Sequence, residues 1–521
     1  MDQLLAEDAF AEYHFFLQSD KNRLFLRESL AGKFPELIAQ KRIKLFLRKD
    51  LYNALTCNTY YCFHLSDCIN YPAYLADLRN KVSNSLFPIT GVTHSLSLSS
   101  YAKDFLAYLW PGCTPRDCIV ATSRAGQEAV RHYFDYLRSS LGLKGLDPEI
   151  PRVRRIPLGV DSNKFFPAGD ELKILSREKL QIEASKIVIL VFGRISHQSK
   201  MDLIPLLRAL QRVAAQEIDL DNVCLCLAGW VDEQDNTQKK IQALASNIAL
   251  EVRFFAKPDE DLKQTIFKSA DLFVSIADNP QETFGLTVLE AAASGLPVLV
   301  SDYDGYKDLV VPGETGYMVP TIGPKQSNFV NMLAPLVHDG LYHQYIAQQT
   351  VVQVPKLAEY LKRLLTDKGL REEMGQKARK QVMQNYTWSQ VLQSYFQLWE
   401  ALWSEEVPWP DRQANHPLQI PYARIFSHYV SQVLDVQDTV YWTRSGEALY
   451  RNQEFPILYF AMEARINTQM LPKIVFLARH PILVQDLLEK GLQAGFCSDR
   501  DQAEYVLLWL IKHDFLEYRI E

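Results

Sequence analysis

Residues 278–308, DNPQETFGLTVLEAAASGLPVLVSDYDGYKD, decide the fold of this chain. They follow directly on DLFVSIA, an apolar run typical of a buried strand, so Asn279 to Glu282 are expected on the loop at that strand's carboxyl end. Gly285 then opens a predicted helix, LTVLEAAAS, which Gly295 and Pro297 close. We therefore expect Glu282 beside the positive end of a helix with unpaired N–H groups, an arrangement that binds anions.

The same kind of strand recurs on both sides of this stretch. KIVILVFG (186–193), VCLCLAG (223–229) and PVLVSD (297–302) are continuous apolar runs, and predicted helices such as LIPLLRALQRVAAQ (203–216) separate them. Continuous rather than alternating apolar strands indicate a parallel sheet that is covered on both faces. The pattern predicts a doubly wound α/β domain over about 170–385, with its ligand site at the carboxyl ends of the strands.

A second carboxylate and two cations accompany Glu282. Glu290 lies eight residues further on, which is roughly 12 Å along a fully helical segment at 1.5 Å per residue. The segment FGRISHQSK places Arg194 just past the strand KIVILVFG and Lys200 six residues later, at the same edge of the sheet. Carboxylates accept hydrogen bonds from hydroxyls, and N–H groups and cations bind phosphates. The ligand expected here is a nucleotide sugar.

These segments resemble the family 4 group of retaining glycosyltransferases with the GT-B fold. Glu282 to Glu290 is similar to the E-x7-E motif of that group, and FGRISHQSK to its Arg/Lys phosphate-binding segment, with a spacing one residue longer than the common form. RRIPLGVDSNKFFP (154–167) resembles the interdomain junction, VVPGETGYMVP (310–320) the segment after the last core strand, and DCIVATSRAG (117–126) the strand and loop before the junction. GVTHSLS (91–97) resembles the loop that supplies a histidine. The resemblance covers about residues 60–400.

The resemblance implies a role for each matching residue. Glu282 would contact the hydroxyls of the transferred sugar, and Glu290 would hold the ribose. Arg194 and Lys200 would neutralise the departing diphosphate, and His94 would approach the donor sugar from the other domain. Such enzymes need no bound metal and no cofactor beyond the nucleotide sugar, here expected to be UDP- or GDP-linked. The remaining donor-binding positions carried over from the motifs are Gly193, Phe284, Gly285, Leu286 and Thr287.

Each of these positions has an alternative interpretation. A glutamate before a helix can simply match the helix dipole, and Arg194 and Lys200 can be solvated surface charges. His64 lies near two cysteines in YCFHLSD, but it lacks a fourth ligand at zinc spacing and is interpreted as a core or cleft histidine. The aspartates of SDYDGYKD are interpreted as turn and helix-start residues rather than metal ligands; they are Asp302, Asp304 and Asp308.

Composition narrows the class of protein. The 521 residues are 47% hydrophobic and 23% charged, with a formal net charge of -6, which indicates a globular protein and disfavours nucleic acid as a partner. Eight cysteines are too few for a disulfide scaffold. Neither a secretory signal nor an apolar run of roughly 18 residues is present, so we expect a cytoplasmic protein, with peripheral association at the inner membrane face left open.

The predicted architecture is α/β, of the GT-B type: two Rossmann-like domains facing a cleft, plus a mainly helical C-terminal extension. We expect an N-terminal, acceptor-binding domain over 1–155, a nucleotide-sugar-binding domain over 156–385, a crossover helix over 386–403 and the extension over 404–521. The first 60 residues contain a single glycine, Gly32, so the usual first βα unit is either replaced or rebuilt from other residues. In the extension, two helices and a short strand have a weak, winged-helix-like pattern, and a helical module packed on the core or on another subunit is the preferred interpretation.

The function that follows from the resemblance is a retaining, metal-independent glycosyltransferase of the hexosyltransferase type. The acceptor stays open among a saccharide, a lipid-linked saccharide, a natural product and a peptide. A non-catalytic GT-B partner that binds a nucleotide sugar or a sister enzyme is an alternative, as is a nucleotide-sugar epimerase or a sugar-phosphate synthase. Homo-oligomer formation through the extension also remains open.

Overall fold

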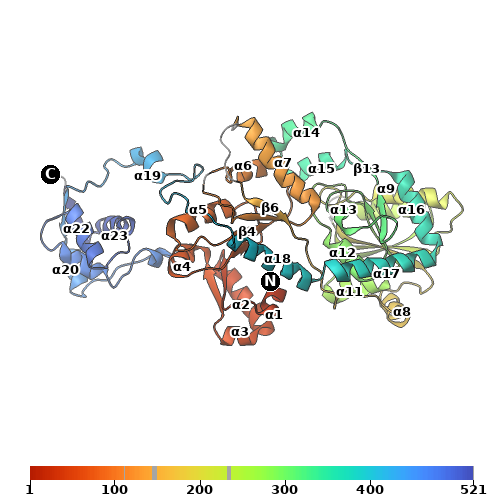
Figure 1. Cartoon of the computed structure of the whole chain (residues 1–521), viewed down its shortest axis with the longest axis horizontal. Helices are drawn as coiled ribbons and strands as arrows, with labels where there is room; N and C mark the ends of the chain where they lie inside the picture. The colour runs from red at the N-terminus through yellow and green to blue at the C-terminus, as the bar shows by residue number, and fades with distance from the viewer. Residues whose placement is uncertain (111, 143–149, 232–235, 520–521) are drawn as a thin grey trace. The chain divides into compact units, whose positions relative to one another are not determined.

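The computed structural model describes residues 1–110, 112–142, 150–231 and 236–519 (Figure 1). The chain divides into two compact units, the first comprising Met1–Glu7 and Thr59–Pro417 and the second Asp8–Asn58 and Leu418–Glu521. The first unit contains both of the larger parallel sheets. None of the helices in the described part of the chain is long and apolar enough to cross a membrane.

A four-stranded sheet forms the N-terminal half of the first unit. Its strands run in the order β3-β4-β5-β6, and all of them are parallel. The polar loops after β4 and β5 therefore lie at the same edge of the sheet. The elements of this half, together with the N-terminal helix, are α1 (Asp2–Glu7), β3 (Phe63–Leu65), α5 (Pro72–Val82), β4 (Ile89–Val92), α6 (Tyr101–Leu106), β5 (Cys118–Ala121), α7 (Arg124–Ser140) and β6 (Arg152–Arg155).

A six-stranded parallel sheet forms the other half, in the order β12-β11-β10-β7-β8-β9. Read from β9, this is the Rossmann order 3-2-1-4-5-6, and the strand order reverses between β7 and β10. The elements are α8 (Asp170–Lys179), β7 (Ile187–Ile195), α9 (Ile204–Ala214), β8 (Val223–Val231), α10 (Thr237–Ser246), β9 (Glu251–Ala256), α11 (Glu260–Ser269), β10 (Leu272–Ser275), α12 (Leu286–Ala293), β11 (Val298–Ser301), α13 (Tyr306–Leu309) and β12 (Gly316–Val319).

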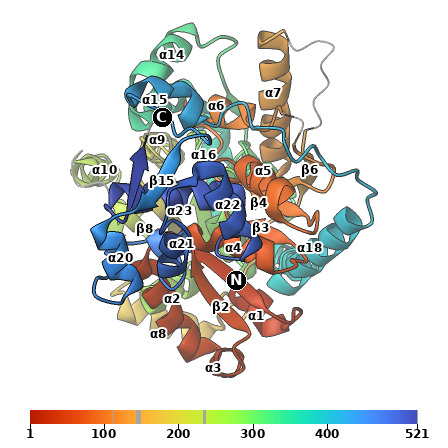
Figure 2. The same cartoon turned by 90° about the vertical axis from the view of Figure 1, so that its left-hand side faces the viewer.

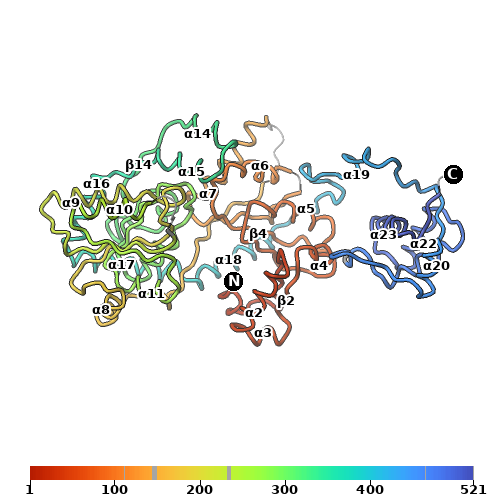
Figure 3. The backbone as a smooth tube through the Cα atoms, turned by 180° about the vertical axis from the view of Figure 1, so that it is seen from behind, coloured from red at the N-terminus to blue at the C-terminus, as the bar shows by residue number. Residues whose placement is uncertain are grey.

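Both faces of this sheet are buried, as the continuous apolar strands predict. On β7, Ile189 and Val191 belong to the core that contains α9, whereas Val188 and Leu190 belong to the core that contains α12. Helix α16 (Val354–Thr366) lies near α9 (Figures 1 and 3), and both helices contribute to the first of these cores, whereas α11 and α17 (Lys368–Asn385) contribute to the second. The expected doubly wound domain is therefore present.

The chain leaves β12 through a helical excursion and then returns to the first half. A short antiparallel pair, β13 with β14, closes the two ends of the excursion. The closing helix α18 reaches the four-stranded sheet, where Trp399 Nε1 donates to Thr90 Oγ1 at 3.2 Å. These elements are β13 (Thr321–Ile322), α14 (Asn328–Leu333), η3 (Ala334–Leu336), α15 (Asp339–Ala347), β14 (Val351–Val352), α16 (Val354–Thr366), α17 (Lys368–Asn385) and α18 (Trp388–Trp403).

In the second unit, residues 8–58 form a βαβ unit whose first loop, after β1, contains no glycine. Strands β1 and β2 are parallel and pair with each other, while the four-stranded sheet begins at β3. Ser19 stands in the loop after β1, and its Oγ accepts from Asn22 N at the start of the next helix. This grouping separates 8–58 from the rest of the expected 1–155 domain. The elements are β1 (Tyr13–Leu17), α2 (Asp20–Lys33), α3 (Pro35–Ala39), β2 (Ile43–Leu47), η1 (Arg48–Asp50) and α4 (Leu51–Cys57).

The C-terminal extension has its own sheet and core (Figure 2). The expected two helices and short strand are present as α22, α23 and β17, although residues 520–521 of the expected strand lie outside the described part. The central strand of the antiparallel order β16-β15-β17 was not foreseen. The elements are α19 (Tyr422–Ile425), η4 (Ser427–Tyr429), β15 (Thr439–Trp442), α20 (Arg444–Tyr450), η5 (Met462–Ala464), α21 (Leu471–Leu477), β16 (Ile482–Leu483), α22 (Val484–Gln493), α23 (Arg500–Lys512) and β17 (Leu516–Arg519).

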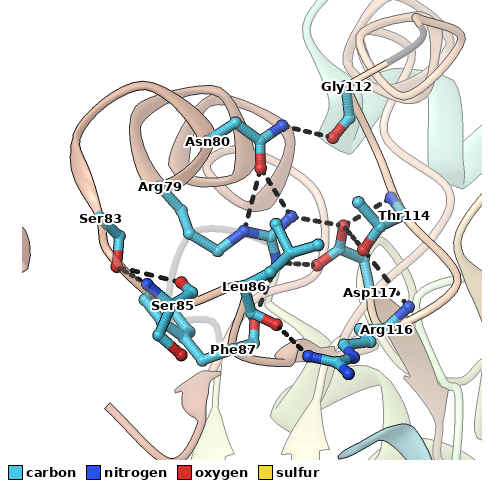
Figure 4. A network of polar contacts seen from close by, with 10 residues as sticks. All are labelled: Arg79, Asn80, Ser83, Ser85, Leu86, Phe87, Gly112, Thr114, Arg116 and Asp117. Carbon is cyan, nitrogen blue, oxygen red and sulfur yellow. Dashed lines mark hydrogen bonds and ion pairs between the residues drawn. The ribbon is translucent and has the colours of Figure 1, made fainter. Parts of the chain in front are cut away.

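A buried ion pair ties helix α5 to the segment that precedes β5 (Figure 4). Arg79 is fully buried, and its Nη1 and Nη2 donate to the two carboxylate oxygens of Asp117 at 2.6 and 3.1 Å. Arg79 also donates to Phe87 O, and Asp117 accepts from the N and Oγ1 of Thr114. Because every charged group has partners, the pair can be held in the core.

We expect Asp117→Ala to lower the free energy of unfolding by about 3–5 kcal/mol, because it leaves the Arg79 charge buried and uncompensated. Chemical denaturation measures the change. Glu128→Ala is the control, since Glu128 pairs with Arg131 on the exposed face of α7 and should cost no more than about 0.5 kcal/mol. Equal effects of the two substitutions would contradict the structural role of the buried pair.

Candidate functional site

The loop after β10 and the start of α12 lie at the switch point of the six-stranded sheet. Gly285 is the residue before α12, with a φ of 106°, and a Cβ there would come within 2.5 Å of the Tyr306 ring. Only glycine fits this position without strain. The helix ends at Ala293, one residue before the end of the predicted LTVLEAAAS, and Gly295 follows the cap residue Ser294 with a φ of 73°. Leu286, the first residue of α12, is 42% exposed, which leaves this helix start open.

Glu282 is the centre of the contacts at this loop. Its Oε2 forms an ion pair with Lys200 Nζ and accepts from the Tyr306 hydroxyl at 3.3 Å. Its Oε1 accepts from the backbone N of Phe284 at 3.3 Å. The structure therefore brings together two of the predicted site residues from the ends of two strands, β7 and β10.

Lys200 is almost completely buried, with 8% of its surface exposed. Burial and the neighbouring Arg194 guanidinium lower the pKa of its ammonium group to about 7, whereas the carboxylates of Asp304 and Glu282 favour its charged form. A lysine in this position gains most from an additional anion, because an anion would offset the cost of burying the charge. A phosphate group is such an anion.

Asn279 joins the loop after β7 to the loop after β10. It is fully buried, its Nδ2 donates to Gln198 O at 2.8 Å, and its Oδ1 accepts from Gln281 N at 3.1 Å. Arg194 Nη1 donates to Gln281 Oε1 at 3.3 Å. At the end of β7, Gly193 has a φ of 152°, and a Cβ there would lie 3.7 Å from Lys200 Cε. Both predicted cations thus meet the 278–308 segment.

Glu290 lies on α12 and has one carboxylate oxygen without a hydrogen-bond partner among the described residues. Lys263 Nζ, on α11, donates to Glu290 Oε1 at 2.6 Å. Among the described residues, neither Glu290 Oε2 nor Thr287 Oγ1 has a hydrogen-bond partner, although both atoms are buried. Burial raises the pKa of the Glu290 carboxyl, and Lys263 acts in the opposite direction. Two unpaired buried oxygens on one helix favour a ligand that carries hydroxyl groups.

A cavity of about 570 Å³ lies between α7 and the loops after β10 and β11. One wall comes from α7 and the loop after β4, the other from the two loops of the six-stranded sheet. Thr283, the neighbour of Glu282, lines the cavity, whereas Glu282 and Lys200 themselves are not among the lining residues. The lining residues are Leu96, Ser97, Ala125, Gly126, Ala129, His132, Tyr133, Tyr136, Pro280, Thr283, Tyr303, Asp304 and Lys307.

The structure places His94 on the exposed loop after β4. Its neighbours Leu96 and Ser97 line the cavity, whereas His94 is not among the lining residues. None of the contacts recorded for the described residues joins His94 to the 278–308 segment. His94 is thus the predicted site residue that the structure does not bring to the others, and its predicted role stays a prediction.

The aspartates of the 302–308 segment have functions beyond forming a turn. Asp304, at a φ of 45°, lines the cavity, and burial raises the pKa of its carboxyl to about 7. Asp308 pairs with Arg124 at the start of α7 and with Arg155 at the end of β6. Sequence reasoning missed these contacts, together with Lys263 and Gln281, because each partner lies far away along the chain.

His64 packs as an aromatic residue of the first half. Its Nδ1 lies 2.8 Å from Thr90 Oγ1, and its ring makes edge contacts with Tyr395 and Trp399 of α18. Within the described ranges, no group of three or more His, Cys, Asp and Glu side chains is placed to hold a metal ion.

Known proteins resemble the half of the chain that carries these loops. Residues 173–350 match the model of a family described as glycosyl transferases group 1. Over 214 residues the chain is 30% identical to mannosylfructose-phosphate synthase of Agrobacterium fabrum, covering 40% of this chain and 44% of the relative. It is 29% identical over 200 residues to a D-inositol 3-phosphate glycosyltransferase of Corynebacterium jeikeium, covering 38% of this chain and 46% of the relative. The matches span less than half the length of these curated relatives.

A solved structure of similar fold is a glycosyltransferase from Rickettsia africae ESF-5. It covers 76% of this chain and 100% of its own, with a TM-score of 0.50 and 15% identity. At that identity the likeness shows the fold alone. The chain has the GT-B arrangement of two Rossmann-like domains, as the sequence predicts.

A buried carboxyl beside the site allows a test by pH. Asp278 is 3% exposed, its Oδ1 has no partner among the described residues, and burial raises its pKa to about 8. In the unfolded chain an aspartate has a pKa of about 4. Between about pH 4 and pH 8 the folded state therefore holds a proton on Asp278 that the unfolded state has lost. The free energy of unfolding therefore falls as the pH rises through this interval.

We expect Asp278→Asn to remove that dependence. The variant should have a thermal unfolding midpoint close to the parent at about pH 4, and a higher midpoint than the parent at about pH 8. Asp302→Asn, which changes an exposed carboxylate in a neighbouring loop, is the control and should leave the pH profile unchanged. The same shift at both pH values would contradict a protonated Asp278 in the folded state.

Proposed function

We propose that this chain is a retaining, metal-independent glycosyltransferase that moves a hexosyl group from a nucleotide sugar to an acceptor hydroxyl. The buried pair of Lys200 with Glu282 carries the proposal, because it stands at the switch point of a Rossmann sheet, beside an open helix start, with Arg194 close by. The family match over 173–350 supports it. The activity of the whole chain, its donor and its acceptor are part of the proposal.

The donor would lie along α12. The ribose hydroxyls would donate to the unpaired Oε2 of Glu290, near the unpaired Oγ1 of Thr287. The diphosphate would meet the first N–H groups of the helix, together with Arg194 and Lys200. The sugar would then stand at the cavity beside Glu282, whose carboxylate accepts hydrogen bonds from its hydroxyls.

Bond breaking places negative charge on the diphosphate, and this chain supplies the charges that stabilise it. As the bond between the anomeric carbon and the phosphate oxygen breaks, Lys200 and Arg194 neutralise the departing oxygen. The acceptor hydroxyl forms the new bond on the face that the leaving group vacates, and its proton passes to the departing phosphate. The configuration at the anomeric carbon is thereby retained. The two cations supply the charge for which other enzymes use a metal ion.

The acceptor would bind in the 570 Å³ cavity, and the cavity lining favours an apolar body that carries the reacting hydroxyl. Ala125, Gly126 and Ala129 leave the N-terminal part of the cavity-facing side of α7 without long side chains. The Tyr133 hydroxyl is occupied, because it donates to Leu96 O at 2.8 Å, so its ring faces the cavity as an apolar surface. Asp304 is the carboxylate in the cavity wall, and its raised pKa suits an acceptor that brings little charge.

We expect release of nucleoside diphosphate when the chain is incubated with UDP-, GDP- and ADP-sugars and a panel of acceptor alcohols. Metal independence predicts the same rate with and without EDTA. Glu282→Gln should lower turnover by roughly 100-fold or more while nucleoside diphosphate binding changes little, because the interaction with the sugar is lost and the cations remain. Arg194→Ala should weaken both turnover and nucleoside diphosphate binding.

The panel distinguishes the competing functions. A partner subunit would bind nucleotide without releasing it, and an epimerase would change the sugar without releasing nucleoside diphosphate. If no donor and acceptor pair gave release, the transferase function would be wrong. If Glu282→Gln kept full activity, the site assignment would be wrong.

We expect acceptors with an alkyl or aryl body to react faster than free monosaccharides, and Ala129→Leu to lower kcat/KM for those acceptors by about ten-fold, because the added side chain fills the cavity. Nucleoside diphosphate affinity, measured by titration calorimetry, should stay within about two-fold. Arg131→Leu places the same side chain on the exposed face of α7 and is the control. Preference for free sugars, with no effect of Ala129→Leu, would refute this acceptor class.

A further inference from the structure

A buried histidine outside the sequence motifs contacts both halves of the first unit. His343 lies on α15, in the helical excursion over 323–350, and none of its surface is exposed. Its Nε2 lies 3.0 Å from both the carbonyl O and the Oγ of Ser97, in the loop after β4. Its Nδ1 lies 2.6 Å from Nε2 of Gln281, in the loop after β10.

These partners fix the tautomer of His343. The Ser97 carbonyl can only accept, so the ring proton is on Nε2. Nδ1 then accepts, and the Gln281 amide donates to it. This orientation turns Gln281 Oε1 toward Arg194, whose Nη1 donates to it at 3.3 Å. Burial lowers the pKa of His343, with Arg194 acting in the same direction and Asp339 and the Ser97 hydrogen bond acting against it, so the neutral ring is favoured.

The excursion that carries His343 is fixed at several points. The β13–β14 pair closes its ends, and Asp339, at the start of α15, accepts from the N and Oγ of Ser99, both at 3.0 Å. Figures 1 and 3 show α15 close to α6 and α7. The ring is therefore held at both of its nitrogens and has little freedom to turn.

We propose that His343 is a positioning residue for diphosphate binding. Through Gln281 it orients the Arg194 side chain, and its hydrogen bond to Ser97 makes this orientation depend on the loop after β4 being in place. The proposal rests on the transferase function above and adds a residue to it. Arg194 is the exposed cation of the site and needs such a support, since the side chain of arginine loses considerable rotamer freedom when it is held in one geometry. If the Gln281 side-chain amide were rotated by half a turn, its NH2 group rather than its oxygen would face the Arg194 guanidinium.

Two substitutions of His343 separate the two contacts. Asparagine places a carbonyl oxygen near the Nδ1 position and can still accept from Gln281, whereas glutamine places an amide near the Nε2 position and can still donate to Ser97. We expect His343→Gln to weaken UDP or GDP binding by about ten-fold, which corresponds to a lost hydrogen bond that supports a charged group. His343→Asn should stay within about three-fold of the parent.

Titration calorimetry with UDP and GDP measures these affinities, with thermal unfolding as the test of folding. His338→Asn is the matched control, because His338 caps the same helix and asparagine is an equally good cap. Gln281→Leu should reproduce His343→Gln, and the double variant should be no weaker than either single variant, because both act through one contact.

The outcomes are separable from those of the proposed function. If the parent binds neither nucleotide, the proposed function fails. If the parent binds and Arg194→Ala weakens binding, but His343→Gln and His343→Asn behave alike, or Gln281→Leu has no effect, the positioning role is wrong. If His343 only supported the fold, both His343 variants would lower the unfolding midpoint equally, and neither variant would be expected to bind nucleotide more tightly than the other.

Discussion

The site depends on one buried ion pair, Lys200 with Glu282, at the point where the strand order of the six-stranded sheet reverses. A buried pair contributes little to stability, because desolvation offsets its attraction. Here the two charged side chains instead keep each other in position at the site. In the proposed function, a nucleotide sugar would offer a diphosphate to the lysine and hydroxyls to the glutamate, so both groups would exchange one partner for another without entering or leaving water.

The second half of the first unit could be predicted because its signals are local. Strands such as β7 are apolar throughout, and Gly285 and Gly295 bound a helix for steric reasons that a sequence displays directly. Parallel strands then bring the residues after β7 and β10 to one edge, which is why Arg194, Lys200 and Glu282 could be assigned to one site from sequence. Their roles follow from the family resemblance and remain to be tested by activity.

The other contacts of the site and the fold of the second unit could not be predicted, because the contacting residues are distant along the chain and the elements carry no motif. Lys263 on α11 gave no sign that it would pair with Glu290, and His343 lies in an excursion that carries no motif. In the second unit, β1 is followed by Ser19 rather than by glycine, so the missing glycines concealed a βαβ unit that is nonetheless present. The strand β15 was missed because its neighbours in the sheet come later in the chain.

The two halves of the first unit contribute different chemistry to the same cavity. The six-stranded sheet supplies charges at fixed positions, and α7 supplies small and aromatic side chains. Contacts between the halves run through buried or paired groups, Asp308 with Arg124 and His343 with Ser97, rather than through apolar packing alone. Such contacts have strict geometry, so hydrogen bonds set the walls of the cavity, whose lining is mainly apolar but includes the charged side chains of Asp304 and Lys307. In the proposed function, an apolar cavity beside a buried ion pair would exclude water from the reacting bond and so protect an activated sugar from hydrolysis.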